Sequence, residues 1–513
     1  MKHPKLIAAA LTAALGIAAP AVRAEMPDSI GYTVGVIGGG ANHAFNPYLL
    51  GANNFGRTPM GGTALLDVAA HKTMDLSSRF SWEAGVEALT GYSRKADYMK
   101  YAPDGQWTSR GAGPAPVWLQ QLYGSVKYRG VFASVGMKER GSELVNDTLS
   151  SGDLVHSANA RPIPQVRVGF VDFQNIPFTN GWAQINGKIA YGKMDQGKYL
   201  ENHYNYYSSH ITTGSLYMYA NIYFRSNPAK PLMVTVGMTH AGMFGGTTSF
   251  YDKGQLTRTV HNSQKLKTFW QMFIPKQGNA DNYFDGSHLG SWDFRADWRL
   301  AGGHTLSGYF QWLWEDGSGM GRRNKWDGLW GVEYRREGGG HVLDGAVIEY
   351  IDFRDQSGPM HWAPGDHPGT TITGEATGGD DYYNNSAFNA YAYHGLSMGT
   401  PFIVSPLYNT NGYPQFMHTR SRGFHAAACG TITGTWRWRA AVSHAVAWGQ
   451  GRLHTNEPLH NTSAMARVDW DGAFGIQRLS ASAALAFDAG SLRGDNVGAL
   501  VSLTYTGNIN FSK

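Results

Sequence analysis

The sequence predicts an all-β protein: a transmembrane, antiparallel, up-and-down β-barrel of about 18 strands. Three observations lead to this prediction. Short amphipathic segments follow one another along the chain, the connections between them alternate between long and short, and no segment of the mature chain is apolar enough for a membrane-spanning helix. A barrel in an outer membrane has short periplasmic turns, long outer loops and an even number of strands.

Period-two alternation is clearest in four segments. In 213–224, every second residue is apolar: Leu216, Met218, Ala220, Ile222 and Phe224. The same alternation marks 305–314, 478–488 and 496–506. Each segment is close to the roughly ten residues that a tilted strand needs to cross the hydrocarbon. These segments therefore predict strands with one lipid-facing and one lumen-facing side.

The connections sort into two classes by length. The long ones are expected at 38–62, 93–116, 138–164, 194–212, 241–288, 316–325, 354–416 and 449–460. The short ones are expected at 73–78, 129–130, 173–181, 226–229, 301–302, 338–341, 429–430 and 471–475. The alternation fails only at the last outer connection, near 490–494, which is short although a long one is expected there. The two largest outer loops are thus 241–288 and 354–416, and we expect a short helix from Lys265 to Met272, folded over the barrel mouth.

Residues 1–24 have the pattern of a cleaved signal peptide. Lys2 and Lys5 supply a positive start, 6–19 is apolar, and 22–24 is a small-x-small cleavage signal before Glu25. The apolar run is too short to span a bilayer. We therefore expect export to the bacterial outer membrane and a single barrel domain over 25–513.

Composition agrees with this class of protein. Charged residues make up 16% and aromatic residues 13%, and 66 of 513 residues are glycine. Without Lys2, Lys5 and Arg23, the chain keeps 40 basic against 38 acidic residues. Such a balance, with no basic patch, gives no reason to expect a nucleic-acid partner. Cys429 is the only cysteine, so no intrachain disulfide is possible.

Motifs for catalysis or metal binding lack the context that they need. The stretch 395–399 fits G-x-S-x-G, but that motif requires a strand–turn–helix to expose its serine. His361, Asp366 and His367 match no zinc spacing. We therefore expect no enzyme activity, no cofactor and no metal site. An outer-membrane enzyme acting on lipid or glycan would need a nucleophile–base pair at the rim, and no such spacing is recognised.

Three stretches of the chain resemble a known family. They are SSGDLVHSANARPIP at 150–164, IPFTNGW at 176–182, and DDYYNN at 380–385 followed by YHGLSMGTPF at 393–402. They resemble the capsule assembly protein Wzi family, in its shorter Bacteroidetes-like members. The resemblance implies an outer-membrane β-barrel lectin that holds capsular polysaccharide. The best-known members carry an N-terminal helical segment, whereas only 25–30 precede the first expected strand here, so no role of that segment is carried over.

The loop rhythm places 138–164 and 354–416 on the same, outer side. Together they offer a candidate polysaccharide-binding set: Asn159, Arg161, Tyr382, Tyr383, Asn384, Asn385, Tyr391 and Tyr393. Aromatic faces stack on the C–H patches of sugars, and asparagine and arginine bind hydroxyls and carboxylates. The alternative is that these residues join the loops into a lid.

Arg420 and Arg422 share one face of the strand expected after the longest loop. As a lumen-facing pair they would suit an anionic polymer. The alternative is a ladder of salt bridges inside the lumen.

The leading functional hypothesis is a surface lectin that helps to attach or assemble a capsule. A repeating polymer would make many weak contacts with the outer loops. The high effective concentration of its neighbouring repeats would then retain it. The alternative is a sugar-selective or general diffusion porin, because about eighteen strands can enclose an aqueous channel. Whether 241–288 and 354–416 fold over the mouth separates the two. Surface polysaccharide and outer-membrane lipids are the expected partners, and a monomer is expected.

Overall fold

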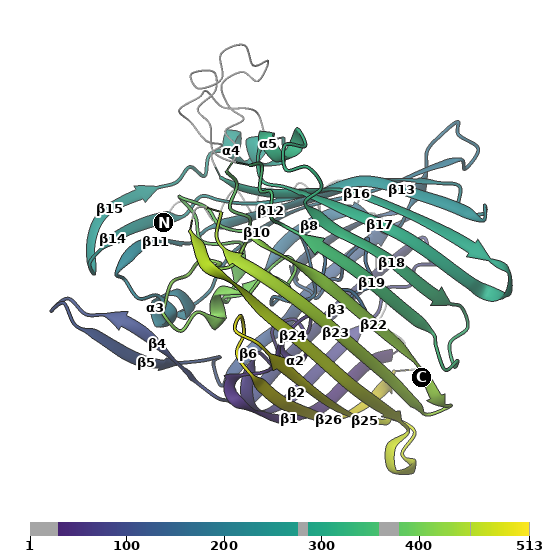
Figure 1. Cartoon of the computed structure of the whole chain (residues 1–513). Coiled ribbons are helices and arrows are strands. Elements are labelled where there is room, and N and C mark those ends of the chain that lie inside the picture. Colours follow the sequence, from purple (N-terminus) through teal and green to yellow (C-terminus); the bar gives the residue numbers. More distant parts are fainter. Residues whose placement is uncertain (1–28, 275–285, 359–378, 452, 512–513) are drawn as a thin grey trace.

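A computed structural model describes residues 29–274, 286–358, 379–451 and 453–511. The expected signal peptide lies outside the described residues, as do His361, Asp366 and His367. The dominant feature is one antiparallel sheet whose two ends meet where the last strand pairs with the first (Figure 1). Its strands are β1 (Ser29–Phe45), β2 (Met60–Lys72), β3 (Phe80–Ser93), β6 (Val117–Tyr128), β7 (Val131–Met137), β8 (Gln165–Phe170), β9 (Gln174–Asn175), β10 (Ala183–Lys193), β12 (Leu216–Ser226), β13 (Leu232–Phe244), β16 (Ser287–Leu300), β17 (His304–Trp314), β18 (Gly328–Arg336), β19 (Gly345–Asp352), β22 (Ser421–Thr433), β23 (Trp436–Gly449), β24 (His454–Asp471), β25 (Leu479–Ala489) and β26 (Asn496–Asn510).

The sheet is a closed barrel of eighteen positions, as the sequence predicts. Of the nineteen strands, β9 only continues β8, because both pair with β10. Every neighbouring pair around the ring is antiparallel and sequential, which is an up-and-down barrel. Closure leaves no unpaired edge, and a membrane-spanning sheet requires this because lipid offers no hydrogen-bond partners. No helix in the described part of the chain has the length and hydropathy of a membrane span.

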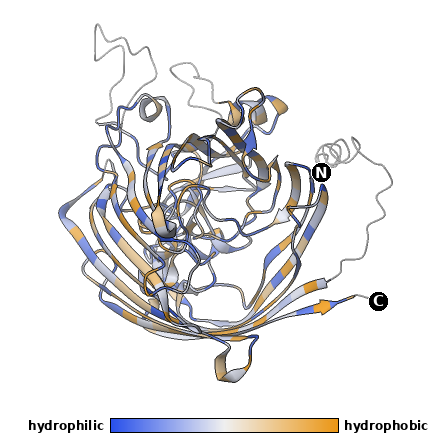
Figure 2. Ribbon diagram, turned by 90° about the vertical axis from the view of Figure 1, so that its right-hand side faces the viewer, coloured by the Kyte–Doolittle hydropathy of each residue, from blue (hydrophilic) through white to orange (hydrophobic). Residues whose placement is uncertain are grey.

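The two faces of the barrel differ in the way that alternation requires. On β1 and β2, Val34 lies opposite Val68 and Val36 opposite Leu66, and all four side chains are exposed on the outer wall. The residues that alternate with them, such as Ile37 and Asp67, face the lumen. Aromatic pairs lie at the short-turn end, such as the stacked rings of Trp436 and Trp470, 5.0 Å apart. Figure 2 shows hydrophobic residues alternating with polar ones along the strands.

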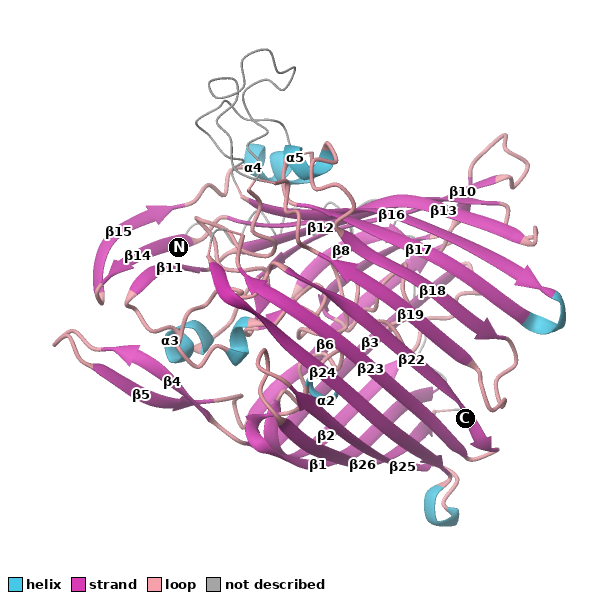
Figure 3. Cartoon of the chain, in the orientation of Figure 1, coloured by secondary structure: helices cyan, strands magenta, loops and turns pink. Residues whose placement is uncertain are grey.

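The long connections gather at one end of the barrel, which is the outer end of a bacterial barrel (Figure 3). They carry short elements: α2 (Tyr48–Gly51), the hairpin β4 (Ala96–Tyr101) and β5 (Trp107–Ala112), α3 (Tyr199–His203), and the sheet of β11 (Ser208–Thr213), β14 (Thr247–Asp252) and β15 (Gln255–His261). Further along follow α4 (Leu266–Phe273), α5 (Gly317–Met320), β20 (Ala392–Tyr393), β21 (Leu396–Ser397) and η2 (Pro406–Tyr408). At the other end, η1 (Ala301–Gly303) and η3 (Ala473–Gly475) lie in short turns.

One predicted long connection is wrong. Residues 449–460 were expected to form an outer loop, but β24 begins at His454 and leaves only 450–453 between the strands. The pairing of β23 with β24 shifts register between Ala447 and Gly449. Between their two partners, Leu459 and His454, residues 455–458 have no partner on β23, so the polar stretch with Pro458 is an irregularity within β24. The last connection, 490–495, is short as expected.

The predicted short helix is confirmed, but its expected position over the mouth is wrong. It runs from Leu266 to Phe273, one residue later than predicted. Its buried Met272 packs with Met218 and Phe244, which lie on the outer wall of the barrel rather than in the lumen. The amphipathic pattern predicts a helix with one buried face, but it does not say which surface buries that face.

Candidate functional site

Two connections fold inward and fill much of the lumen. The segment 138–164, after β7, and the described part of the connection between β19 and β22, from 379 to 420, contribute most of the main hydrophobic core. Leu154 and Val155 from the first segment are fully buried among Tyr383 and Tyr391 from the second. The core also includes lumen-facing residues of the wall, from β10 through β23. We call these two segments the plug.

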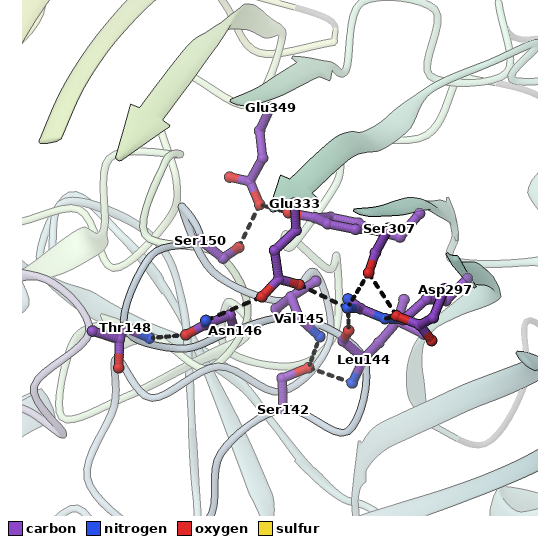
Figure 4. Close-up of polar contacts among 12 residues, drawn as sticks. Ser142, Leu144, Val145, Asn146, Thr148, Ser150, Asp297, Ser307, Glu333 and Glu349 are labelled. Carbon is purple, nitrogen blue, oxygen red and sulfur yellow. Dashed lines mark hydrogen bonds and ion pairs between the residues drawn. The ribbon is translucent and has the colours of Figure 1, made fainter. Parts of the chain in front are cut away.

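Polar contacts fix the first plug segment to the wall (Figure 4). Glu349 on β19 accepts hydrogen bonds from the Ser150 hydroxyl at 2.6 Å and the Ser151 amide at 2.7 Å, and Tyr309 donates to the same carboxylate at 2.6 Å. Glu333 on β18 accepts from the Asn146 side chain at 3.1 Å. Because these carboxylates are buried, the hydrogen bonds offset much of their desolvation cost.

A second buried network joins the plug to the connection after β1. Arg57 forms ion pairs with Glu87 on β3 and with Glu139, whose carboxylate oxygen lies 2.7 Å from the guanidinium. Asp67 on β2 lies 4.0 Å away. Gln120 on β6 donates to Glu139 at 2.7 Å. One cation therefore holds three carboxylates together inside the barrel.

A cavity of about 420 Å³ remains between the plug and the wall formed by β22–β26, β1 and β2. Small side chains on that wall leave the space, among them Ala441, Ala484 and Ser502. Arg439 and Arg467, which lie directly opposite each other on β23 and β24, line the cavity. The lumen is therefore filled on one side and hollow on the other.

The plug uses most of the predicted sugar-binding residues for its own contacts. The buried members of the predicted set are Asn159, Tyr382, Tyr383, Tyr391 and Tyr393. Their polar atoms bind other parts of the protein: Tyr383 donates to the Leu154 carbonyl at 2.6 Å, Tyr391 to the Val155 carbonyl at 2.9 Å and Asn159 to the Ser397 carbonyl at 2.9 Å. Tyr393 donates to the carbonyl of Asp195 at 2.7 Å. These contacts agree with the alternative interpretation, in which the residues join the loops into a lid.

The other predicted plug residues are half-buried. Asn384 exchanges hydrogen bonds with the backbone of Phe416, both at 2.9 Å, and Asn385 accepts from the amides of its own turn. Arg161 holds its guanidinium 4.5 Å from the centre of the Trp118 ring. The structure therefore brings the eight plug residues together, but within the loops rather than on an open surface.

The expected lumen position of Arg420 and Arg422 is wrong. On β22, Ser421 and His425 face the lumen and are buried, while Arg422 is exposed on the outer wall, 5.6 Å from the centre of the Trp448 ring. Arg420 precedes β22 and has its guanidinium 3.5 Å from the ring of His454. The physical reason is the alternation itself, since His425 faces inward to bind the Leu149 carbonyl of the plug at 2.8 Å.

The serine of the G-x-S-x-G match is not exposed. Ser397 is fully buried on the two-residue strand β21, and irregular chain follows it rather than a helix. None of the described residues form a cluster of three or more histidine, cysteine, aspartate or glutamate side chains that could hold a metal ion.

Buried carboxyl groups from neighbouring connections contact the outer edge of the plug. Burial raises the pKa of Asp327, which precedes β18, to about 7. Burial, together with the neighbouring charge of Asp380, raises the pKa of Glu315 well above its ordinary range. Asp327 accepts hydrogen bonds from the Gln356 amide at 2.8 Å and the Tyr382 hydroxyl at 3.0 Å. This edge of the plug therefore favours neutral carboxyl groups.

This arrangement predicts that the plug loosens as pH rises. The pKa of Asp327 is about 7 in the folded protein, whereas its ordinary value is 3.8. The contribution of this carboxyl group to the stability of the folded state is therefore full below pH 3.8 and is lost as pH rises through 7. Hydrogen exchange corrected for its intrinsic pH dependence should show less protection of the Tyr391 amide, which donates to the Tyr383 carbonyl within the plug, at pH 8 than at pH 5. Asp327→Asn should flatten this difference. Equal protection at both values in the unmodified protein would contradict the prediction.

An aromatic cluster on the outer loops escaped the sequence analysis. Tyr101 and Trp107, on the hairpin β4–β5, and Tyr207, after α3, have ring centres 5.0 to 5.2 Å apart. Trp107 is 43% exposed. The hairpin is fixed in place, since the Tyr101 amide donates to the Asn205 carbonyl at 2.8 Å. We call these three residues the aromatic triad.

Cationic groups lie on the other face of the hairpin from Tyr101 and Trp107. Lys100 has its ammonium 5.3 Å from the centre of the Tyr206 ring and donates to the carbonyls of Glu201 and Tyr204. Burial, with the neighbouring charge of Arg110, lowers the pKa of Lys100 to about 8. Arg110 itself is exposed. The triad itself therefore offers flat ring faces, which are the groups that stack on the C–H patches of sugars. The tyrosines of 204–207 were a signal in the sequence, but they are about a hundred residues from Trp107.

No protein-family model matches this chain, and no curated protein matches it. Among solved structures, the chain is similar to Wzi, described as an outer membrane protein involved in group 1 capsule assembly in Escherichia coli and as a carbohydrate-binding β-barrel. The TM-score is 0.56 at 14% identity, over 99% of this chain and 88% of that one. It is also similar to OccAB2 of Acinetobacter baumannii, with a TM-score of 0.48, 8% identity, and coverage of 94% and 98%. A third similar structure is OpdK of Pseudomonas aeruginosa with vanillate, with a TM-score of 0.45, 10% identity, and coverage of 94% and 98%. The similarity to Wzi is a similarity of fold, and it shows that this chain shares the β-barrel architecture of that protein.

Proposed function

We propose that this protein is a non-enzymatic, Wzi-like outer-membrane lectin that holds a surface polysaccharide and helps to attach or assemble a capsule. The observation that carries the proposal is the aromatic triad, Tyr101, Trp107 and Tyr207, on the outer loops. Exposed ring faces suit the C–H patches of a sugar. A polymer with many repeats gains retention through effective concentration.

The plug supports binding over transport. A diffusion porin needs a continuous aqueous path, and here two long segments pack a hydrophobic core into the lumen. The cavity beside the plug is the observation that keeps the porin as the second candidate, because about 420 Å³ of the lumen is unfilled.

Two measurements on one sample test the proposal. The refolded protein in a planar bilayer is expected to be silent, while the same protein in lipid nanodiscs retains the polysaccharide extracted from the host's cell surface on a surface sensor. A stable, large open conductance without polysaccharide retention would overturn the proposal and favour the porin. Retention with no conductance would support the lectin.

A further inference from the structure

Helix α4 lies against the lipid-facing wall of the barrel. Its Met272 is fully buried with Met218 on β12 and Phe244 on β13. The Tyr191 hydroxyl on β10 donates to the Phe269 carbonyl of the helix at 2.7 Å. Strand alternation places Met218 on the outer wall, because its neighbours Tyr217 and Tyr219 belong to the core inside the lumen. The helix therefore covers the outside of the barrel.

The helix packs on the outer wall at the end of the barrel that carries the long loops. Met218 lies near the start of β12 and Phe244 ends β13, and both ends belong to the long-loop side. Further along the same outer face of β12, Ile222 and Phe224 are exposed and belong to the apolar belt of the wall. The surface that α4 presents is therefore continuous with the lipid-facing surface of the barrel.

The exposed side of α4 is an apolar stripe with two lysines at its N-terminal end. Leu266, Trp270 and Phe273 are 72%, 58% and 36% exposed and recur at i, i+4 and i+7, so at about 100° per residue they share one face. Exposed Lys267 lies beside this face in the first turn, and exposed Lys265 directly precedes the helix. This is the pattern of a helix that lies in a membrane interface, with lysines reaching the phosphate groups.

We propose that α4 is an interfacial anchor that binds a phosphate-bearing lipid of the outer leaflet. Leu266, Trp270 and Phe273 insert among the upper acyl chains, and Lys265 and Lys267 pair with lipid phosphates. Lipid is the occupant because the stripe continues the belt that already faces lipid, and because tryptophan favours this depth of a membrane. The anchor would hold the described residues 262–274 close to the membrane surface.

Depth-dependent quenching tests the proposal on the whole chain. In a Cys429→Ala background, Trp270→Cys carries an environment-sensitive fluorophore, and the protein is refolded into phosphatidylcholine vesicles that contain nitroxide-labelled lipid. The label at 270 should be quenched most by a nitroxide at the headgroup. Ile222→Cys on the belt should be quenched most by a nitroxide deep in the acyl chain. Leu256→Cys, exposed on β15, should be quenched by neither. A label at 270 that behaves like the label at 256 would overturn the anchor.

A second comparison tests the lysines. The Trp270→Cys label should be quenched about twofold more by headgroup-labelled phosphatidylglycerol than by headgroup-labelled phosphatidylcholine, because basic residues near the surface enrich anionic lipid. Lys265→Gln with Lys267→Gln should abolish this preference while leaving the depth of the label unchanged. Equal quenching by the two lipids with both lysines present would overturn the assignment of a phosphate-bearing lipid.

Discussion

Replacing Trp107 by alanine is expected to weaken the binding of a short polysaccharide fragment about 30-fold, because loss of a central aromatic anchor costs about 2 kcal/mol. Trp107 is the most exposed ring of the triad and contacts both Tyr101 and Tyr207. Tyr207→Ala should have a smaller effect, since its ring is less exposed and packs against the other two rings. Surface plasmon resonance on nanodisc-embedded protein measures both variants.

The matched control for this substitution is Trp182→Ala. Trp182 is 61% exposed, but it lies in the short turn before β10, at the opposite end of the barrel. Its removal should leave polysaccharide binding unchanged. If Trp182→Ala and Trp107→Ala weaken binding equally, or if neither does, the aromatic triad is not the sugar-binding surface.

Arg57→Ala is expected to lower the free energy of unfolding by about 3 kcal/mol, because removing one partner of a buried ion network leaves uncompensated charge. Glu87, Glu139 and Asp67 would then share a buried site with no cation from position 57. Arg57→Lys should recover part of the loss, since an ammonium cannot reproduce the fork of contacts. Urea unfolding in lipid vesicles, followed by tryptophan fluorescence, measures the free energy.

The control is an ion pair between the same types of group that is exposed to solvent. Arg437 and Asp471 form a close ion pair at 2.8 Å in which both side chains are about half exposed. Arg437→Ala should cost less than about 1 kcal/mol, as exposed ion pairs do. Combining Arg57→Ala with Glu87→Gln and Glu139→Gln should restore much of the stability, because neutral amides tolerate the loss of the cation. Failure of this rescue would show that Arg57 acts through packing and not through charge.

Much of the fold could be predicted because its signals are local. Period-two alternation places Ile222 and Phe224 on the outer wall, and the order of long and short connections predicts which end carries the loops. The error at 449–460 has the same origin, because a polar stretch with Pro458 has the local composition of a loop. In the structure this stretch lies within β24, between the paired residues His454 and Leu459.

The candidate site could be predicted only in part. Tyr382, Tyr383 and Tyr391 have the composition of a sugar-binding surface, and the sequence placed them near 150–164, as the structure does. The exposed fraction of each ring could not be predicted from composition, because it depends on which segments pack against that ring in the folded protein. The motif stretches 150–164 and 380–402 form the plug, whereas the exposed triad comes from other connections.

The strand pattern, the closure of the barrel and its two-sided wall follow from the sequence alone, since each depends on the spacing of neighbouring residues. Which connections enter the lumen, which rings stay exposed and which surface receives α4 were decided by tertiary packing. The contact between the Tyr383 hydroxyl and the Leu154 carbonyl joins residues 229 positions apart. No local pattern encodes such a pairing, because its free energy arises only when both segments are buried together.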